Sequence, residues 1–311
     1  MIGVFDSGLG GLTVLKEIIK VLPEYDYLYL GDTLHVPYGN RSDKAIYDLT
    51  KKACDYLFSH GCMLIIIACN TATAKALRRL QQEYLPSMVV LRPIDMLGAG
   101  EAQHDIRNIL GVIRPVAEEI ARSNKKRVGV IGTRGAVNSN AYVVELEGQR
   151  ARGEGQGAKV KGQKQGQNIN AKIKNLQTGE SELQIFQNAC PLLVPMIEEG
   201  WMKRKEMKMI LRYYLRPLKK AQVETLILGC THYPLLLKQI RGMMGKKCFV
   251  PNPGEIVAAS LKDYLARHSE MEAALTKNKT RRYLVTDLND NFQKTAERFL
   301  GERVDLEAAS Y

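Results

Sequence analysis

Near its N-terminus the chain reads Ile2-Gly-Val-Phe-Asp-Ser-Gly-Leu-Gly-Gly11, an apolar run that passes into a glycine-rich turn. Similar apolar runs recur through the first third of the chain and predict strands at Ile2–Phe5, Tyr27–Leu30, Met63–Ala68 and Met88–Leu91. Between them, apolar residues at helical spacing predict helices at Leu12–Leu22, Asp43–Ser59 and Thr71–Tyr84. This alternation of strand and helix is typical of a doubly wound α/β fold with a parallel sheet.

Two of the predicted strands end in polar residues that favour a functional site. Ligands of doubly wound sheets bind at the carboxyl ends of strands, which places Asp6-Ser7-Gly8 and Cys69-Asn70-Thr71 at the functional edge. The turn after Asp6 lacks the Gly-Lys-Ser/Thr of a phosphate-binding loop, and the Asp6 carboxylate would repel a pyrophosphate. Asp6 therefore fits general acid/base chemistry better than nucleotide binding.

The second part of the chain repeats this pattern. Gly129-Val-Ile-Gly-Thr133 resembles the first strand, and Leu226-Ile-Leu-Gly-Cys-Thr-His232 resembles the strand that ends at Cys69. We therefore expect two similar doubly wound parallel-sheet domains, related by a pseudo-twofold duplication, with the active site in the cleft between them. The predicted domain boundaries are 1–93 with 252–311 for the first domain and 94–251 for the second.

Composition limits the class of protein. The 311 residues are 45% hydrophobic and 25% charged, enough for two domains with buried cores. No apolar run is long enough for a membrane helix, and the six cysteines lack disulfide or CxxC spacing. No basic stretch precedes an apolar one at Met1–Asp6, so we do not expect a signal peptide. We therefore expect a cytoplasmic protein with reduced thiols and no membrane partner.

The net charge of +12 is partly local. The glycine- and glutamine-rich stretch Gly148–Glu180 carries +5 and is predicted to be a mobile surface insertion. A further basic run, from Lys203 to Lys220, has the spacing of an amphipathic helix with a solvated face. Without a zinc-finger or RNA-binding motif, we do not expect nucleic-acid binding.

Cys69 and Cys230 each lie between a predicted strand and a helix. A helix N-terminus lowers the pKa of a thiol and attracts anions, and Asn70, Thr71 and Thr231 add side-chain donors in the same turns. His232 can exchange a proton near neutral pH. Racemisation of a carbon acid requires an acid/base pair with one group on each side, because one group removes the α-proton and the other returns a proton to the opposite face. The two thiols suggest such a pair. Cys54, Cys62 and Cys248 fit buried structural positions instead.

Seven motifs occur in the order of one enzyme family: Gly3-Val-Phe-Asp-Ser-Gly-Leu-Gly-Gly11, Gly31-Asp-Thr with Val36-Pro-Tyr-Gly39, Ala68-Cys-Asn-Thr-Ala72, Gly111-Val-Ile-Arg-Pro115, Gly129-Val-Ile-Gly-Thr133 with Ser139-Asn-Ala-Tyr142, Cys190-Pro-Leu-Leu-Val-Pro-Met-Ile-Glu-Glu199 and Leu228-Gly-Cys-Thr-His-Tyr-Pro234. On these motifs the chain resembles the glutamate racemases of the cofactor-independent aspartate/glutamate racemase superfamily. The resemblance implies that Cys69 abstracts the α-proton of D-glutamate and Cys230 that of L-glutamate. Asp6 would assist Cys69, and His232 with Glu198 would assist Cys230.

The resemblance also implies the substrate contacts and partners. The residues that would bind the amino and carboxylate groups of glutamate are Ser7, Tyr38, Gly39, Asn70, Thr71 and Thr231. The family uses no pyridoxal phosphate or other cofactor and no metal, supplies D-glutamate for peptidoglycan precursors and commonly forms homodimers. This chain departs from the family pattern at Ala136, where a threonine is usual, and in the extra segments Leu91–Asn108 and Gly148–Glu180.

Other functions stay open at this stage. A related racemase could act on aspartate or a hydantoin, although His232 favours glutamate. The basic segments could belong to a nucleic-acid- or partner-binding module without catalysis. Dithiol redox chemistry between Cys69 and Cys230 would need the two sulfurs in bonding contact, which a cleft wide enough for an amino acid forbids.

Overall fold

The structure is a computed structural model of the chain, and it describes residues 1–90, 106–123, 125–153 and 183–310. The chain divides into two compact units, Met1–Val112 with Val257–Tyr311 and Ile113–Ile256. The domain boundaries drawn from the sequence remain predictions.

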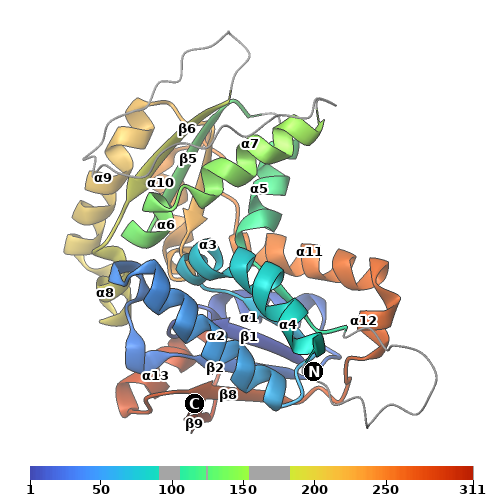
Figure 1. The fold of residues 1–311 in the computed structure, drawn as a ribbon. Helices are drawn as coiled ribbons and strands as arrows, with labels where there is room; N and C mark the ends of the chain where they lie inside the picture. Colours follow the sequence, from blue (N-terminus) through green and yellow to red (C-terminus); the bar gives the residue numbers. More distant parts are fainter. Residues whose placement is uncertain (91–105, 124, 154–182, 311) are drawn as a thin grey trace, which may run out of the picture. The chain divides into compact units, whose positions relative to one another are not determined.

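The first unit is built on a parallel sheet. Within the described residues this sheet has six strands in the order β4-β3-β1-β2-β8-β9. Figure 1 labels four of them, β1, β2, β8 and β9. Its strands are β1 (Ile2–Asp6), β2 (Tyr27–Gly31), β3 (Leu64–Ile67), β4 (Asn108–Gly111), β8 (Arg281–Val285) and β9 (Leu306–Ala308). Its helices are α1 (Leu12–Val21), η1 (Thr33–His35), η2 (Tyr38–Asn40), α2 (Asp43–Ser59), α3 (Asn70–Arg79), η3 (Leu80–Tyr84), α4 (Leu85–Val90), α11 (Pro253–Arg267, which begins in the second unit), α12 (Ser269–Ala273) and α13 (Asp290–Leu300).

Local sequence explains most of these elements. Every residue of β1, β2 and β3 is buried, as expected for parallel strands covered on both faces. Helix α2 begins where the Ser42 hydroxyl accepts a hydrogen bond from the Ala45 amide, a helix N-cap. Helix α13 ends at Gly301, which adopts a positive φ of 79°. The strands and helices predicted at residues 2–5, 12–22, 27–30, 43–59 and 63–68 are confirmed.

The strand predicted at Met88–Leu91 is wrong. Residues Leu85–Val90 form helix α4, which continues α3 through the π-helical turn η3. Leu85 and Met88, three residues apart, are partly buried against the core of the first unit, so the apolar pattern serves a helix face. The place beside β3 is taken by β4 instead. Of the extra segment predicted at Leu91–Asn108, residues 91–105 lie outside the described residues.

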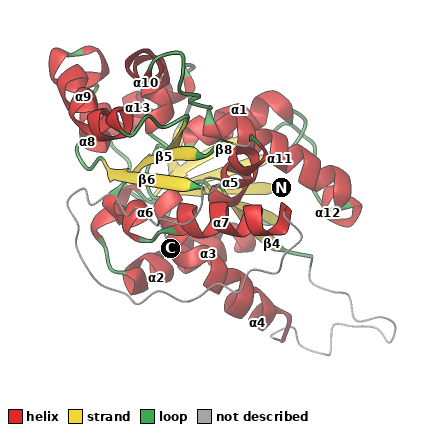
Figure 2. Cartoon of the chain, turned by 90° about the horizontal axis from the view of Figure 1, so that it is seen from above, coloured by secondary structure: helices red, strands yellow, loops and turns green. Residues whose placement is uncertain are grey.

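The second unit has a smaller parallel sheet. In the part of the chain that the structure describes, it contains three strands in the order β6-β5-β7. Figure 2 labels β5 and β6. These are β5 (Arg127–Gly132), β6 (Gln184–Ala189) and β7 (Thr225–Gly229). The helices of this unit are α5 (Ile113–Arg122), α6 (Arg134–Asn138), α7 (Ala141–Gly153), α8 (Leu193–Glu198), η5 (Trp201–Lys203), α9 (Lys205–Lys220), η6 (Tyr233–Leu236) and α10 (Leu237–Met244). The predicted α/β class with two parallel sheets is confirmed, and the two sheets differ in size.

The insertion predicted at Gly148–Glu180 is wrong for its first residues. Residues 148–153 complete helix α7 rather than forming a loop. Polar side chains hold this last part of the helix, because Gln149 donates to Glu118 and Arg150 donates to the carbonyl of Lys125, at 3.4 and 2.5 Å. The remainder of the predicted insertion lies outside the described residues.

The central strand of each sheet pairs in an equivalent way with the strand that precedes a cysteine. Gly3 of β1 pairs with Ile65 of β3, and Gly129 of β5 pairs with Leu226 of β7. Cys69 and Cys230 each lie four residues beyond these partners. Both cysteines therefore follow their strands at the same position relative to the central strand, as an internal duplication would produce.

Candidate active site

Cys69 lies where β3 passes into α3. It is the N-cap residue of α3, and its sulfur accepts a long hydrogen bond of 3.5 Å from the amide of Ala72. The Ser7 hydroxyl, at the end of the neighbouring strand β1, lies 3.1 Å from the same sulfur. Cys69 is 6% exposed, and Asn70 and Thr71 are buried in the first turn of α3. The sequence therefore placed Cys69 correctly at a helix N-terminus, where negative charge on sulfur is stabilised.

Asp6 ends β1 within the same cluster. Its carboxylate accepts a hydrogen bond of 3.1 Å from the amide of Gly8, and the side chain is buried. The backbone of Gly11, at the start of α1, approaches Asp6 so closely that a Cβ there would lie 2.5 Å from the Asp6 Cβ. The buried Tyr29 hydroxyl donates a hydrogen bond to the carbonyl of Gly8 at 2.7 Å and so holds the same turn from strand β2. These contacts hold Asp6 and Ser7 in one defined turn at the end of β1.

Tyr38 is placed differently from Ser7 and Asp6. Its ring packs in the core against Phe5, with a centroid distance of 6.3 Å, and its hydroxyl donates to Asp32 at 2.6 Å. Asp32 also accepts hydrogen bonds from Thr286 at 2.9 Å and lies 2.8 Å from the ring of His35. Gly39 follows Tyr38 in the short helix η2.

Asp32 is a buried residue of this region whose role was not predicted from the sequence. It lies directly after β2, is fully buried, and anchors the segment that carries Tyr38 and Gly39. The signal was present in the sequence, since a carboxylate at a strand end marks the same edge of the sheet as Asp6.

Cys230 follows β7 in the second unit, with His232 two residues later. The Nδ1 atom of His232 lies 3.9 Å from the Cys230 sulfur, and its Nε2 atom lies 3.0 Å from Oε1 of Glu198. Glu198 comes from the end of α8, far away in sequence, and 34% of its side chain is exposed. The three side chains form a thiol–imidazole–carboxylate row of the kind that activates a thiol.

The charge of His232 follows from this row. Burial alone lowers the pKa of a histidine, but the hydrogen bonds with Cys230 and Glu198 and their negative charges raise the pKa of His232 to about 10. The imidazole is therefore protonated at neutral pH and presents a positive charge to the Cys230 sulfur. Thr231, between the two residues, is buried in the same turn.

The other cysteines differ from these two in their surroundings. Burial raises the pKa of Cys62 to about 12 and that of Cys248 to about 11, and it also raises the pKa of Cys54 and Cys190. Such thiols stay protonated at neutral pH and behave as small apolar side chains. The prediction of structural roles for Cys54, Cys62 and Cys248 agrees with this environment.

The chain is similar to curated glutamate racemases over nearly its whole length. It is 34% identical to the glutamate racemase of Geobacter metallireducens over 305 residues, which covers 97% of this chain and 93% of that protein. It is also 34% identical to the glutamate racemase of Aquifex aeolicus over 310 residues, covering 99% and 97% of the two chains. The chain belongs to the glutamate racemase family. It matches no family model.

Solved structures of glutamate racemases have the same fold as this family member. The structure of the Bacillus anthracis isoform RacE1 matches with a TM-score of 0.76 and 28% identity, covering 100% of this chain and 97% of that one. The structure of the Francisella tularensis enzyme in complex with D-glutamate matches with a TM-score of 0.75 and 27% identity, covering 99% and 97% of the two chains.

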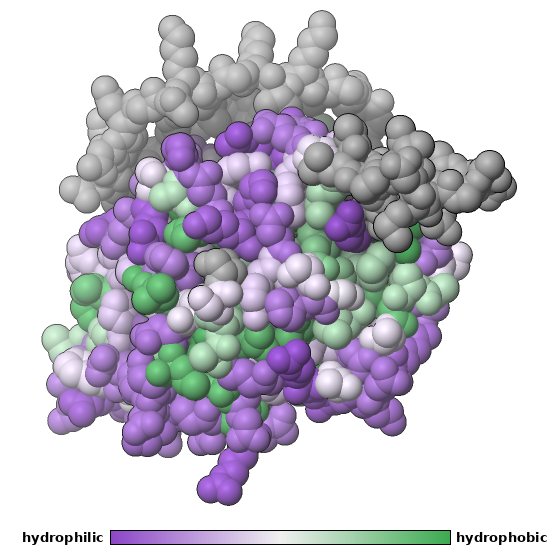
Figure 3. Space-filling view, turned by 60° about the horizontal axis from the view of Figure 1, so that its bottom comes forward, coloured by the Kyte–Doolittle hydropathy of each residue, from purple (hydrophilic) through white to green (hydrophobic). Residues whose placement is uncertain are grey.

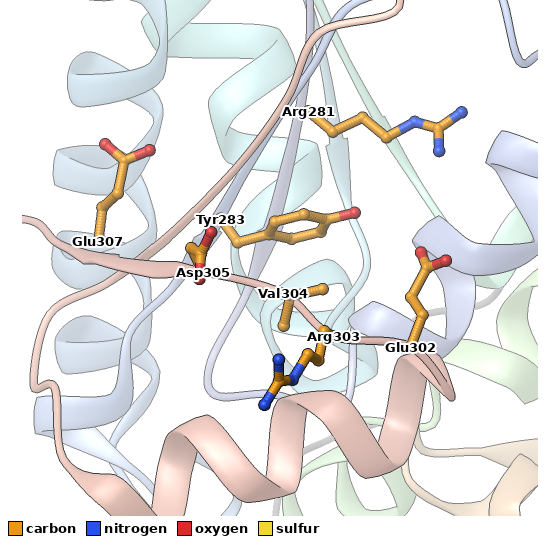
Figure 4. Close-up of a pocket in the computed structure, with 7 residues that line it drawn as sticks. All are labelled: Arg281, Tyr283, Glu302, Arg303, Val304, Asp305 and Glu307. Carbon is orange, nitrogen blue, oxygen red and sulfur yellow. The ribbon is translucent and has the colours of Figure 1, made fainter.

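Two further features of this glutamate racemase family member bear on other kinds of site. Across the described residues, there is no group of three or more His, Cys, Asp or Glu side chains placed to hold a metal ion. A cavity of about 450 Å³ lies beside β8 and β9 and is lined by Arg281, Tyr283, Glu302, Arg303, Val304, Asp305 and Glu307 (Figure 4). The guanidinium groups of Arg281 and Arg303 point away from each other in Figure 4 and do not converge on one ligand. None of the predicted site residues lines it.

Membrane-spanning helices are also absent from the described part of the chain, where no helix is both long and apolar enough to cross a bilayer. The visible surface in Figure 3 mixes hydrophilic residues with small groups of apolar ones.

Proposed function

We propose that this chain interconverts L- and D-glutamate by moving the α-proton between two thiols, without a cofactor. The observation that carries the proposal is the pair of cysteines at equivalent strand ends, each with its own acid–base partners: Ser7 and Asp6 beside Cys69, His232 and Glu198 beside Cys230. Membership of the glutamate racemase family supports glutamate over aspartate or a hydantoin as the substrate.

Cys230 acts on L-glutamate. As a thiolate beside the His232 imidazolium, it removes the α-proton and becomes a thiol. Glu198 holds the imidazole in place through Nε2 and balances its charge. His232 and Glu198 are therefore positioning and electrostatic partners of the thiol.

Cys69 acts on the opposite face of the same carbon. As a thiol it donates its proton to the planar carbanion and yields D-glutamate, and as a thiolate it starts the reverse reaction. The amide of Ala72 and the hydroxyl of Ser7 stabilise the thiolate by hydrogen bonding. Asp6, held in the adjacent turn, assists proton transfer on this side.

Substrate binding falls to polar groups in the same turns. We assign the amino and carboxylate groups of glutamate to Ser7, Tyr38, Gly39, Asn70, Thr71 and Thr231. The Tyr38 hydroxyl donates its hydrogen bond to Asp32. Within this segment, the backbone around Tyr38 and Gly39 is therefore the part that is suited to contact the substrate.

The cellular role and assembly complete the proposal. D-glutamate made in this way enters peptidoglycan precursors in the cytoplasm, and the active chain is a homodimer. Family membership supports the cellular role, and the homodimer is proposed from the family resemblance of the sequence motifs. Light scattering tests the assembly, since a monomer at assay concentration would contradict it.

Proton exchange tests the function. The purified chain in D₂O is incubated with L-glutamate, D-glutamate or L-aspartate, and the α-proton signal and the optical rotation are followed together. We expect both glutamate enantiomers to lose the α-proton and converge on the racemate, while aspartate does not. The variant Cys248→Ser serves as a matched control that retains activity. Absence of exchange with both glutamate enantiomers would refute the proposal.

A further inference from the structure

Helix α9 presents a strongly basic outer face. It lies at one edge of the second unit, beside α8 and α10 (Figure 1 and Figure 2). Its inner face is apolar and buried, through Met207, Leu211 and Leu218 among others. At 100° per residue, Lys205, Arg212 and Arg216 fall near the middle of the opposite side. The outer face thus carries a cationic stripe along 16 residues, or about 24 Å of helix.

The charge of this segment is not balanced locally. Residues 203–220 hold eight Lys or Arg side chains and a single acidic one, Glu206. Of the ion pairs formed between described residues, none involves Lys205, Lys208, Arg212 or Arg216. Lys219 donates to the carbonyl of Met243. The stripe is therefore free to bind an external anionic surface.

Two large apolar side chains lie on the same outer face. Met209 is 65% exposed and Tyr213 is 73% exposed, and their spacing of four residues places them side by side along the stripe. Tyrosine side chains are enriched at membrane–water interfaces, and clustered Lys and Arg side chains are attracted to anionic lipid headgroups.

We propose that the outer face of α9 docks this chain on an anionic lipid surface. Lipid headgroups neutralise the cations, and the headgroup region also accommodates Met209 and Tyr213. The phosphates of a nucleic acid would also neutralise the cations, but they would offer no apolar contact to Met209. A second copy of the same face would repel this one by charge, which excludes a symmetric contact between two α9 helices.

Vesicle sedimentation tests the proposal with the full chain. The probes are vesicles of phosphatidylglycerol mixed with phosphatidylcholine, vesicles of phosphatidylcholine alone, and a single-stranded RNA. The test variant combines Lys205→Gln, Arg212→Gln and Arg216→Gln. The control variant combines Lys52→Gln, Lys262→Gln and Lys294→Gln, which removes the same charge from exposed positions of the first unit. Racemase activity of both variants shows that they fold.

The proposal predicts salt-sensitive binding to the anionic vesicles only. Binding should weaken roughly fivefold for each cation removed from α9, hence about a hundredfold in the test variant, with little change in the control. The double variant Met209→Ser, Tyr213→Ser should also bind more weakly at unchanged charge. Equal losses in the test and control variants, equal binding to both kinds of vesicle, or binding to RNA without binding to vesicles would each overturn the proposal.

Discussion

The substitution Gly11→Ala tests how the turn after β1 positions Asp6. An alanine Cβ at this site would lie 2.5 Å from the Cβ of Asp6, 3.0 Å from its Cγ and 3.1 Å from the Cβ of Ala68. Ordinary contact begins near 3.4 Å, so the closest pair is about 0.9 Å too close. The Asp6 Cβ is fixed to a buried strand and cannot rotate away, so the backbone of the turn must move.

We expect two measurable effects of Gly11→Ala. Overpacking of this kind lowers the free energy of unfolding by about 1–3 kcal/mol, measurable by urea denaturation. A displacement near 1 Å at an acid–base group lowers kcat/KM by about a hundredfold. Because the enantiomers have equal free energy, polarimetry should record the same fractional loss of kcat/KM in both directions.

A matched control separates crowding from the removal of glycine itself. Gly242 lies in α10, and a Cβ there meets nothing within 4 Å. Gly242→Ala should therefore stabilise the chain by about 0.5–1 kcal/mol and leave activity unchanged. Wild-type stability and kinetics in Gly11→Ala would refute the reasoning.

Three further predictions follow from the hydrogen bonds. The fold raises the pKa of His232 from 6.5 to about 10, so protonated His232 contributes its full stabilisation below pH 6.5 and loses it as the pH rises toward 10. In urea titrations, the free energy of unfolding of the wild type should therefore fall relative to that of His232→Asn between pH 6.5 and 10. Glu198→Gln removes the charged partner of His232 and should slow turnover about ten- to a hundredfold by polarimetry, and an unchanged rate would count against the row. Tyr38→Phe removes one hydrogen bond to the buried Asp32 carboxyl group and should lower the free energy of unfolding by about 1.5–3 kcal/mol in urea denaturation. An equally stable variant would contradict the assigned contact.

Local patterns in the sequence predicted much of the first unit. Strands β1, β2 and β3 are short apolar runs buried on both faces, so periodicity and turn residues were sufficient to find them. The same criterion failed at residues 88–91, because a short apolar run suits a buried strand and a helix face equally well. Strand β4 contains few apolar residues and is defined by its pairing with β3, which a local pattern does not reveal.

Some residues of the candidate site could also be found from local sequence patterns, and the contacts of others could not. Cys69, Cys230, Asp6 and His232 could be found because each lies at or just after the end of a strand. Asp32 also lies directly after a strand, but its contact with Thr286, which is 254 positions away, depends on the pairing of β8 with β2, which a local pattern does not reveal. Side-chain orientation is equally hidden from sequence, as the hydrogen bond from the Tyr38 hydroxyl to Asp32 illustrates.

Enantiomer-specific exchange in two single variants tests the two-thiol account most directly. Cys69→Ser and Cys230→Ser are each incubated in D₂O with one glutamate enantiomer, and α-proton loss is followed by NMR beside optical rotation. The account predicts that neither variant racemises, that Cys69→Ser exchanges the α-proton of L-glutamate alone, and that Cys230→Ser exchanges that of D-glutamate alone. Normal racemisation in both variants, or exchange with the opposite enantiomer in each, would contradict it.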